Sequence, residues 1–207
     1  MNVLVEGPAN PKAVYVLAHG AGAGMNHPFM TAVAKGLAER GIATLRYNFP
    51  YMERGSKRVD SPAIAQAAVR EAVAEAARTF PNVPLLAGGK SFGGRMTSQA
   101  QAESPLPGVR GLVFLGFPLH PPGKPSTDRA AHLSSVKIPM LFLQGTRDEF
   151  AQLDLLRPLI GKLGSGATLK LFDDADHSFK VPARSGRKAA EVLAELLDTT
   201  ASWIAAR

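Results

Sequence analysis

Short apolar runs alternate along the chain with longer segments whose apolar residues recur at helical spacing. Residues 14–18 are typical of the runs, and Val33, Ala34 and Leu37 are typical of the helical spacing. Nearly continuous apolar runs are expected where helices cover both faces of a parallel sheet. The alternation therefore predicts an α/β fold with a mostly parallel, doubly wound sheet and helices on both faces. The predicted strands are 14–18, 42–47, 84–88, 109–115, 138–144 and 167–172, and the predicted helices are 28–41, 62–80, 92–103, 152–163 and 186–206.

The chain shows no repeat, low-complexity segment or linker, so we expect one domain over residues 1–207. No stretch approaches the roughly 18 apolar residues of a membrane helix. Residues 1–7 lack the pattern of a secretory signal, and the sequence contains no cysteine. These features favour a cytoplasmic protein that is not membrane-bound, without disulfides or thiolate metal sites.

The net charge of +7 is spread over small clusters, one of them formed by Arg54, Lys57 and Arg58. No aromatic residues interleave with these clusters, as a nucleic-acid stacking platform would require. We therefore expect a solvated basic surface and no nucleic-acid partner, with an anionic substrate or partner as the alternative.

The residues that follow the predicted strands point to a chemistry, because doubly wound sheets carry their sites at the carboxyl ends of the strands. The strand at 84–88 leads into a G-x-S-x-G motif at Gly89, Ser91 and Gly93, and a helix follows. A serine on such a strained strand-to-helix turn is exposed as a nucleophile, and its glycines allow neighbouring backbone to approach. The alternative interpretation is a glycine-rich turn that holds a phosphate at the helix N-terminus.

Two further strand ends carry Asp148 and His177, so that Ser, Asp and His occur in the order found in α/β hydrolases. A serine hydroxyl needs an imidazole to take its proton, and the imidazole needs a carboxylate to hold and stabilise it. We predict Ser91 as nucleophile, His177 as base and Asp148 as acid. Asp148 as a helix N-cap and His177 as an ordinary surface histidine are the alternatives. Asp173, Asp174 and Asp176 are interpreted as a solvated loop.

The glycine-rich segment after the first predicted strand suits an oxyanion hole. We predict that the backbone N–H groups of Phe92 and Ala21 hold the oxyanion, because small residues let the backbone approach a substrate. His19 is interpreted as a buried anchor of this loop.

Several segments together resemble the small α/β hydrolases related to dienelactone hydrolase, and in particular the uncharacterised bacterial members of the KANSL/Tex-type branch. The segments are HGAGAGMNHPFM, RYNFPYMERG, GGKSFGGRM, GFPLHPPGKP, LFLQGTRDEF and DADHSF. The resemblance covers nearly the whole chain. It implies the α/β-hydrolase fold with its first strands shortened, and the triad at Ser91, Asp148 and His177. Ser91 stands where dienelactone hydrolases carry cysteine, and the branch includes members thought to act as scaffolds.

Many relatives insert a cap domain in the interval that corresponds to residues 116–137, which here is short and proline-rich. We therefore expect no cap domain and an open site, with His120, Tyr51, Met52 and Arg54 as candidate rim residues. The sequence leaves the role of Lys90 open.

These observations predict a serine hydrolase that cleaves a small-molecule ester and needs no cofactor or metal. The alternative is a hydrolase-like scaffold or binding protein with little turnover.

Overall fold

Strands of this chain are apolar on both sides because helices cover both faces of the sheet. The computed structural model describes residues 1–207. The strands are β1 (Val3–Glu6), β2 (Ala13–Ala18), β3 (Ile42–Tyr47), β4 (Leu85–Lys90), β5 (Val109–Leu115), β6 (Met140–Gly145) and β7 (Ala167–Phe172). The helices are α1 (Pro28–Ala38), α2 (Pro50–Glu53), α3 (Pro62–Thr79), α4 (Phe92–Glu103), α5 (Leu153–Leu163) and α6 (Ala189–Ala205), with 3-10 turns η1 (Asp128–Ser135), η2 (Gly164–Gly166) and η3 (Ala183–Ser185).

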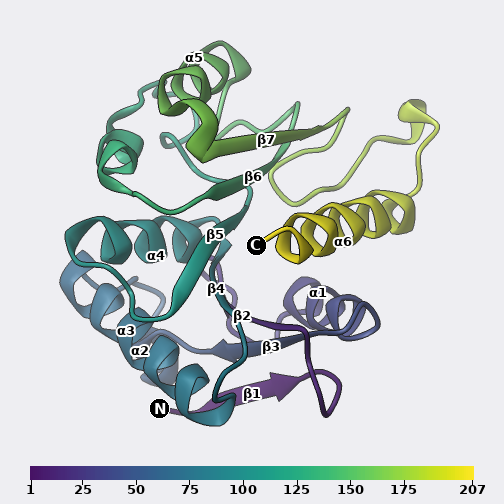
Figure 1. The fold of residues 1–207 in the computed structure, drawn as a ribbon. Coiled ribbons are helices and arrows are strands. Elements are labelled where there is room, and N and C mark those ends of the chain that lie inside the picture. Colours follow the sequence, from purple (N-terminus) through teal and green to yellow (C-terminus); the bar gives the residue numbers. More distant parts are fainter.

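The seven strands form one sheet in the order β1-β3-β2-β4-β5-β6-β7. Only β1 is antiparallel, pairing with β3, and every other neighbouring pair is parallel. Figure 1 shows α3 and α4 on one side of the twisted sheet, and α1 and α6 on the other. The mostly parallel, doubly wound sheet that the alternation predicts is therefore confirmed.

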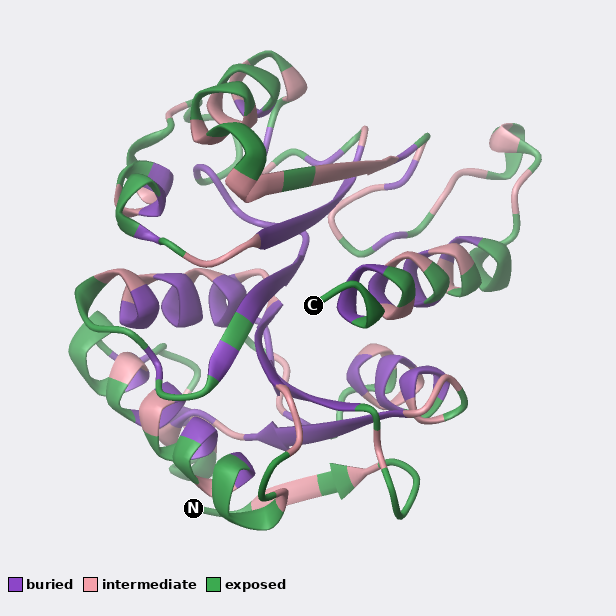
Figure 2. Ribbon diagram, in the orientation of Figure 1, coloured by how far each residue is buried: buried purple, intermediate pink, exposed green.

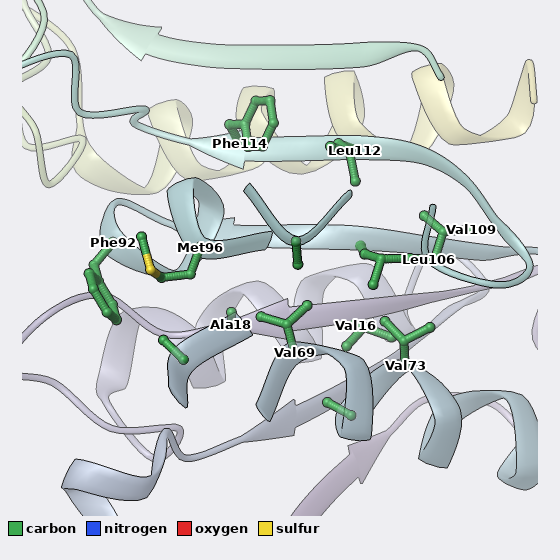
Figure 3. Close-up of a cluster of buried hydrophobic side chains, with 14 of the residues drawn as sticks. Val16, Ala18, Val69, Val73, Phe92, Met96, Leu106, Val109, Leu112 and Phe114 are labelled. Atoms are coloured by element: carbon green, nitrogen blue, oxygen red, sulfur yellow. The ribbon is translucent and has the colours of Figure 1, made fainter. Parts of the chain in front are cut away.

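Alternate residues of each strand point to opposite faces, which divides the core into two parts. Val14, Val16 and Ala18 of β2 belong to a cluster of 32 buried residues with α3 and α4. The intervening Tyr15 and Leu17 belong to a cluster of 20 with α1 and α6. Figure 2 shows the central strands β2 to β6 mostly in purple, as buried, between helices that are green on their outer surfaces, while β1 and β7 at the edges are largely pink or green. In Figure 3, side chains of α3 and α4 lie over those of β2 in the first cluster.

The apolar pattern predicts no strand before residue 14 and no helix at residues 50–53, and the structure has both. β1 has only four residues and lies at the edge of the sheet, where Val5 is exposed. This short exposed strand lacks the continuous apolar run by which the others are found. Several boundaries also move by a few residues: β4 continues to Lys90 and so reaches Ser91 directly.

The segment between β5 and β6 forms no lid. It contains η1, whose Ala130 and Leu133 are buried in the core against α4. His132 Nε2 lies 2.7 Å from Ser98 Oγ of α4, which fixes η1 to the side of the sheet. The predicted absence of a cap domain is confirmed. No helix has the length and hydropathy to cross a membrane.

Candidate active site

Ser91 lies on a strained turn between β4 and α4. Its φ of 48° and ψ of −114° are rare for a residue with a side chain. A Cβ atom at Gly89 would lie 2.2 Å from the carbonyl oxygen of Ala18, and one at Gly93 would lie 2.5 Å from that of His19. Glycine at these two positions therefore lets the turn pack directly against the end of β2. The structure has the close backbone approach that the G-x-S-x-G spacing predicts.

The imidazole of His177 lies between Ser91 and Asp148. His177 Nε2 is 2.8 Å from Ser91 Oγ, and Nδ1 is 2.7 Å from Asp148 Oδ2. The Asp148 side chain is 0% exposed and that of His177 is 17% exposed. With Nδ1–H donating to the carboxylate, Nε2 is free to accept the proton of the serine hydroxyl. The structure brings together the three side chains that the sequence analysis places at three strand ends.

The Asp148 carboxylate is held by other donors as well. The backbone N–H of Phe150 donates to Oδ1 at 2.8 Å, and the side-chain amide of Gln144 donates to Oδ2. Because the N-cap of α5 is Gln152, Asp148 does not cap that helix. The N-cap alternative is therefore wrong, and these donors orient the carboxylate toward His177 instead.

The neighbouring acidic residues do not reach the imidazole. Asp176 Oδ1 accepts the backbone N–H groups of Ser178 and Lys180, at 2.8 and 2.9 Å. Asp174 has a φ of 57°, and its N–H donates to Thr146 Oγ1. The Asp176 carboxylate bonds within its own loop, and Asp148 is the carboxylate bonded to His177.

His19 anchors the glycine-rich loop after β2. It is fully buried, with Nδ1 2.8 Å from the Gly20 carbonyl and Nε2 accepting the Phe49 N–H at 3.1 Å. Burial lowers its pKa below the usual range for histidine. A second tie joins the Gly22 N–H to the Tyr51 hydroxyl at 3.2 Å. The contacts to Phe49 and Tyr51 hold the loop against the chain after β3, in agreement with the structural role expected of His19.

A pocket of about 570 Å³ opens beside Ser91 and His177. Its walls are the glycine-rich loop with Ala21, the first residues of α1, and the loop after β7. Phe150 also lines it, and its ring lies 4.3 Å from the imidazole of His177 between centroids. The lining residues are Gly20, Ala21, Ala23, His27, Pro28, Phe29, Met30, Lys90, Ser91, Phe150, His177, Ser178 and Lys180.

None of the four candidate rim residues lines this pocket. His120 and Tyr51 are fully buried. The His120 N–H donates to the Phe150 carbonyl, which draws the proline-rich segment inward. Helix α2 turns Tyr51 into the core and leaves Met52 in a separate depression beside Gly22. Arg54 is held away by Asp60, with Nη2 2.6 Å from Oδ1.

The pocket walls that sequence reasoning missed belong to α1 and to the loop after His177. The His27-Pro28 pair marks the start of a helix, but only the fold shows that this end of α1 faces Ser91. Ser178 and Lys180 carry no motif of their own. No group of three or more histidine, aspartate or glutamate side chains converges as a metal ion would require.

The comparisons with known proteins agree with this fold. A family model described as "Alpha/beta hydrolase domain" matches residues 11–205. An alpha-beta serine hydrolase homologue from Coxiella burnetii is 22% identical with a TM-score of 0.75, covering 94% of this chain and 88% of that chain.

Two further structures share the fold. A Xanthomonas campestris serine hydrolase described as "without lid" is 22% identical with a TM-score of 0.75, covering 97% of this chain and 88% of its own. Dienelactone hydrolase from Anabaena variabilis is 20% identical with a TM-score of 0.76, covering 97% and 89%. At these identities the structures show a common fold, while the family model spans nearly the whole sequence. The chain belongs to the alpha/beta hydrolase domain family.

Proposed function

We propose that this protein is a serine hydrolase that cleaves carboxylic esters through a covalent acyl-enzyme. The observation that carries the proposal is the continuous hydrogen-bonded series from Ser91 through His177 to Asp148. The motif set also leads us to place the chain in the KANSL/Tex-type branch of its family.

In the proposed reaction, Ser91 Oγ attacks the ester carbonyl while His177 Nε2 takes its proton. The Asp148 carboxylate stabilises the imidazolium that forms, and the imidazolium then protonates the departing alcohol. Water, deprotonated by the same imidazole, attacks the acyl-enzyme and releases the acid. As the acid leaves, the imidazolium returns its proton to Ser91 Oγ, so the two half-reactions together restore the free serine and the neutral imidazole and need no cofactor.

The backbone N–H groups of Ala21 and Phe92 are the proposed oxyanion donors. Phe92 is the first residue of α4, so its N–H has no acceptor within the helix. Ala21 lines the pocket, and its N–H donates to no group of the protein. Donors that are free before the substrate arrives need no reorganisation when charge develops on the carbonyl oxygen.

A panel of aryl esters tests the proposal. Wild-type protein should hydrolyse at least the short members above the buffer rate, and Ser91→Ala should not. A folded wild type that hydrolyses none of them would favour the alternative, a hydrolase-like scaffold. The bonded Ser91, His177 and Asp148 support the enzyme, because a scaffold has no need of an aligned proton relay.

We expect short acyl chains to be preferred, with no interfacial activation. Each methylene that stays in water forgoes about 0.8 kcal/mol of transfer free energy, so an open site gains little from a longer chain. Phe117 and Leu119 are fully buried and form no groove, so the large apolar side chains at the pocket are Phe29, Met30 and Phe150. Comparing kcat/KM for acetyl, butyryl, octanoyl and palmitoyl esters checks this expectation. A steady rise toward palmitoyl would contradict it.

The charged side chains of the pocket, Lys90 and Lys180, are both basic. We propose that these two lysines cause any preference for anionic esters. The cluster of Arg54, Lys57 and Arg58 is not the proposed cause, since Arg54 pairs with Asp60.

The rate should depend on pH through the base. Because only a neutral imidazole accepts the serine proton, we expect kcat/KM to rise from its value at acid pH and then to level. Stopped assays at constant ionic strength would measure this. A rate that is flat from pH 5 to 8 would rule out a histidine base.

A further inference from the structure

Lys90 links the strand of the nucleophile to the loop of the base. It is the last residue of β4 and directly precedes Ser91. Its Nζ donates to the backbone carbonyl of His177 at 2.6 Å and lies 5.8 Å from the centroid of the Phe179 ring. The side chain therefore fastens the loop after β7 to the end of β4.

The ammonium and the imidazole share a space that Gly116 leaves open at the end of β5. A Cβ atom at Gly116 would lie 3.1 Å from Lys90 Nζ and 3.4 Å from both Cε1 and Nδ1 of His177. The positive charge of Lys90 is thus close to the ring that is proposed to gain a proton in each cycle.

Packing alone does not explain a lysine at this position. Its ammonium has one hydrogen-bond acceptor within the protein, and taking a cation out of water is costly. Burial lowers the pKa of Lys90 to about 8, although the nearby carboxylates of Asp148 and Asp176 act in the opposite direction. A methionine would fill a similar volume without that cost.

The charged groups around the His177 ring come from several elements. Asp148 faces it from the loop after β6, Lys90 from β4, and Asp176 from the adjoining part of its own loop. Asp176 Oδ1 is bonded to backbone N–H groups, and Lys180 is exposed at the pocket. Lys90 is the partly buried cation of this set.

We propose, resting on the serine hydrolase function proposed above, that Lys90 is a positioning residue for His177. Its ammonium holds the His177 carbonyl against the strand that carries Ser91. Its charge opposes protonation of the imidazole and so keeps the base neutral at lower pH. A displacement of about 1 Å in such an arrangement can cost about 100-fold in rate.

The absence of cysteine from the sequence allows a sharp test, because Lys90→Cys creates the only thiol. Alkylation of the unfolded variant with 2-bromoethylamine, followed by refolding, restores an ammonium on a chain of the same length as lysine. Alkylation with 1-bromopropane gives a chain of that length without charge. Lys90→Met provides a genetic version of the uncharged chain, and Lys124→Met removes an exposed lysine as a control. Wild type carried through both alkylations controls for side reactions.

We expect Lys90→Met and the propyl derivative to lose about 10- to 100-fold in kcat on a short aryl ester, with KM changed less than about threefold. The midpoint of the acid limb of the pH–rate profile should rise by about one unit. The aminoethyl derivative should recover most of the wild-type kcat and most of the wild-type acid-limb midpoint. Lys90→Met should unfold at a temperature no lower than wild type, because it removes a partly buried charge.

Equal kcat and equal acid-limb midpoints for the propyl and aminoethyl derivatives would overturn the proposal. A lowered unfolding temperature that accompanies the loss of activity in Lys90→Met would overturn it too, by showing a structural role. If the wild type hydrolyses esters and the Lys90 variants do so equally well, the role proposed for Lys90 is contradicted and the proposed function is not. A folded wild type that neither turns over esters nor reacts at Ser91 contradicts the proposed function, and this inference with it.

Discussion

Replacement of Ser91 by alanine should lower kcat for a short aryl ester by about 10⁴- to 10⁶-fold. Without the hydroxyl no acyl-enzyme forms, and only the binding and oxyanion contacts remain to accelerate attack by water. Alanine has the same backbone restrictions as serine at a φ of 48°, so the turn should be kept. Steady-state hydrolysis measures the loss, and circular dichroism checks that the variant is folded.

Ser98 offers a matched control, because the chain contains a second serine–histidine pair. Ser98 Oγ lies 2.7 Å from His132 Nε2, beneath η1. Burial, and then the charge of Arg95, lower the pKa of His132 to about 4, which makes it a poor base. We expect Ser98→Ala to keep its rate within about threefold of wild type. Loss of activity in Ser98→Ala with full activity in Ser91→Ala would show that Ser91 is not the nucleophile.

Replacement of Asp148 by asparagine should lower kcat by about 10³- to 10⁴-fold without unfolding the protein. The amide has nearly the shape of the carboxylate but can donate to His177 Nδ1. It then favours the tautomer whose Nε2 carries a proton and cannot act as a base. The Gln144 side-chain amide donates to Asp148 Oδ2. In the variant either the oxygen or the nitrogen of the asparagine must take the place of Oδ2, so the two atoms compete for the same partners. The same ester assay and a thermal unfolding curve measure the two effects.

Asp176→Asn is the control for this prediction. Its carboxylate accepts backbone N–H groups within its own loop, and an asparagine oxygen can accept them as well. The rate should therefore change far less than in Asp148→Asn. A crippled Asp176→Asn beside a nearly active Asp148→Asn would reassign the acid.

The sheet and the positions of Ser91, Asp148 and His177 could be predicted because both depend on local patterns. Apolar runs mark strands that are buried on both faces, and parallel strands bring their carboxyl ends to one edge of the sheet. Residues directly after three such runs must lie near that edge, whatever the length of chain between them. The glycines around Ser91 add a local steric requirement that the sequence displays directly.

The pocket walls could not be predicted because they depend on how loops pack. Tyr51 and His120 look like surface residues in polar or proline-rich segments, yet hydrogen bonds to Gly22, Asp60 and Phe150 draw these segments into the core. For the same reason, the sequence does not predict the contact between Lys90 and His177. This contact joins residues 87 positions apart, and no spacing rule relates them.

Labelling with a fluorophosphonate shows whether Ser91 is an activated nucleophile, because the probe requires such a serine and no knowledge of the substrate. We expect one adduct on the folded protein, located at Ser91 by peptide mapping after intact-mass analysis. Labelling should be lost on unfolding and in His177→Ala, which keeps the hydroxyl but removes its base. An unlabelled native protein, or an adduct on another residue, would contradict the account.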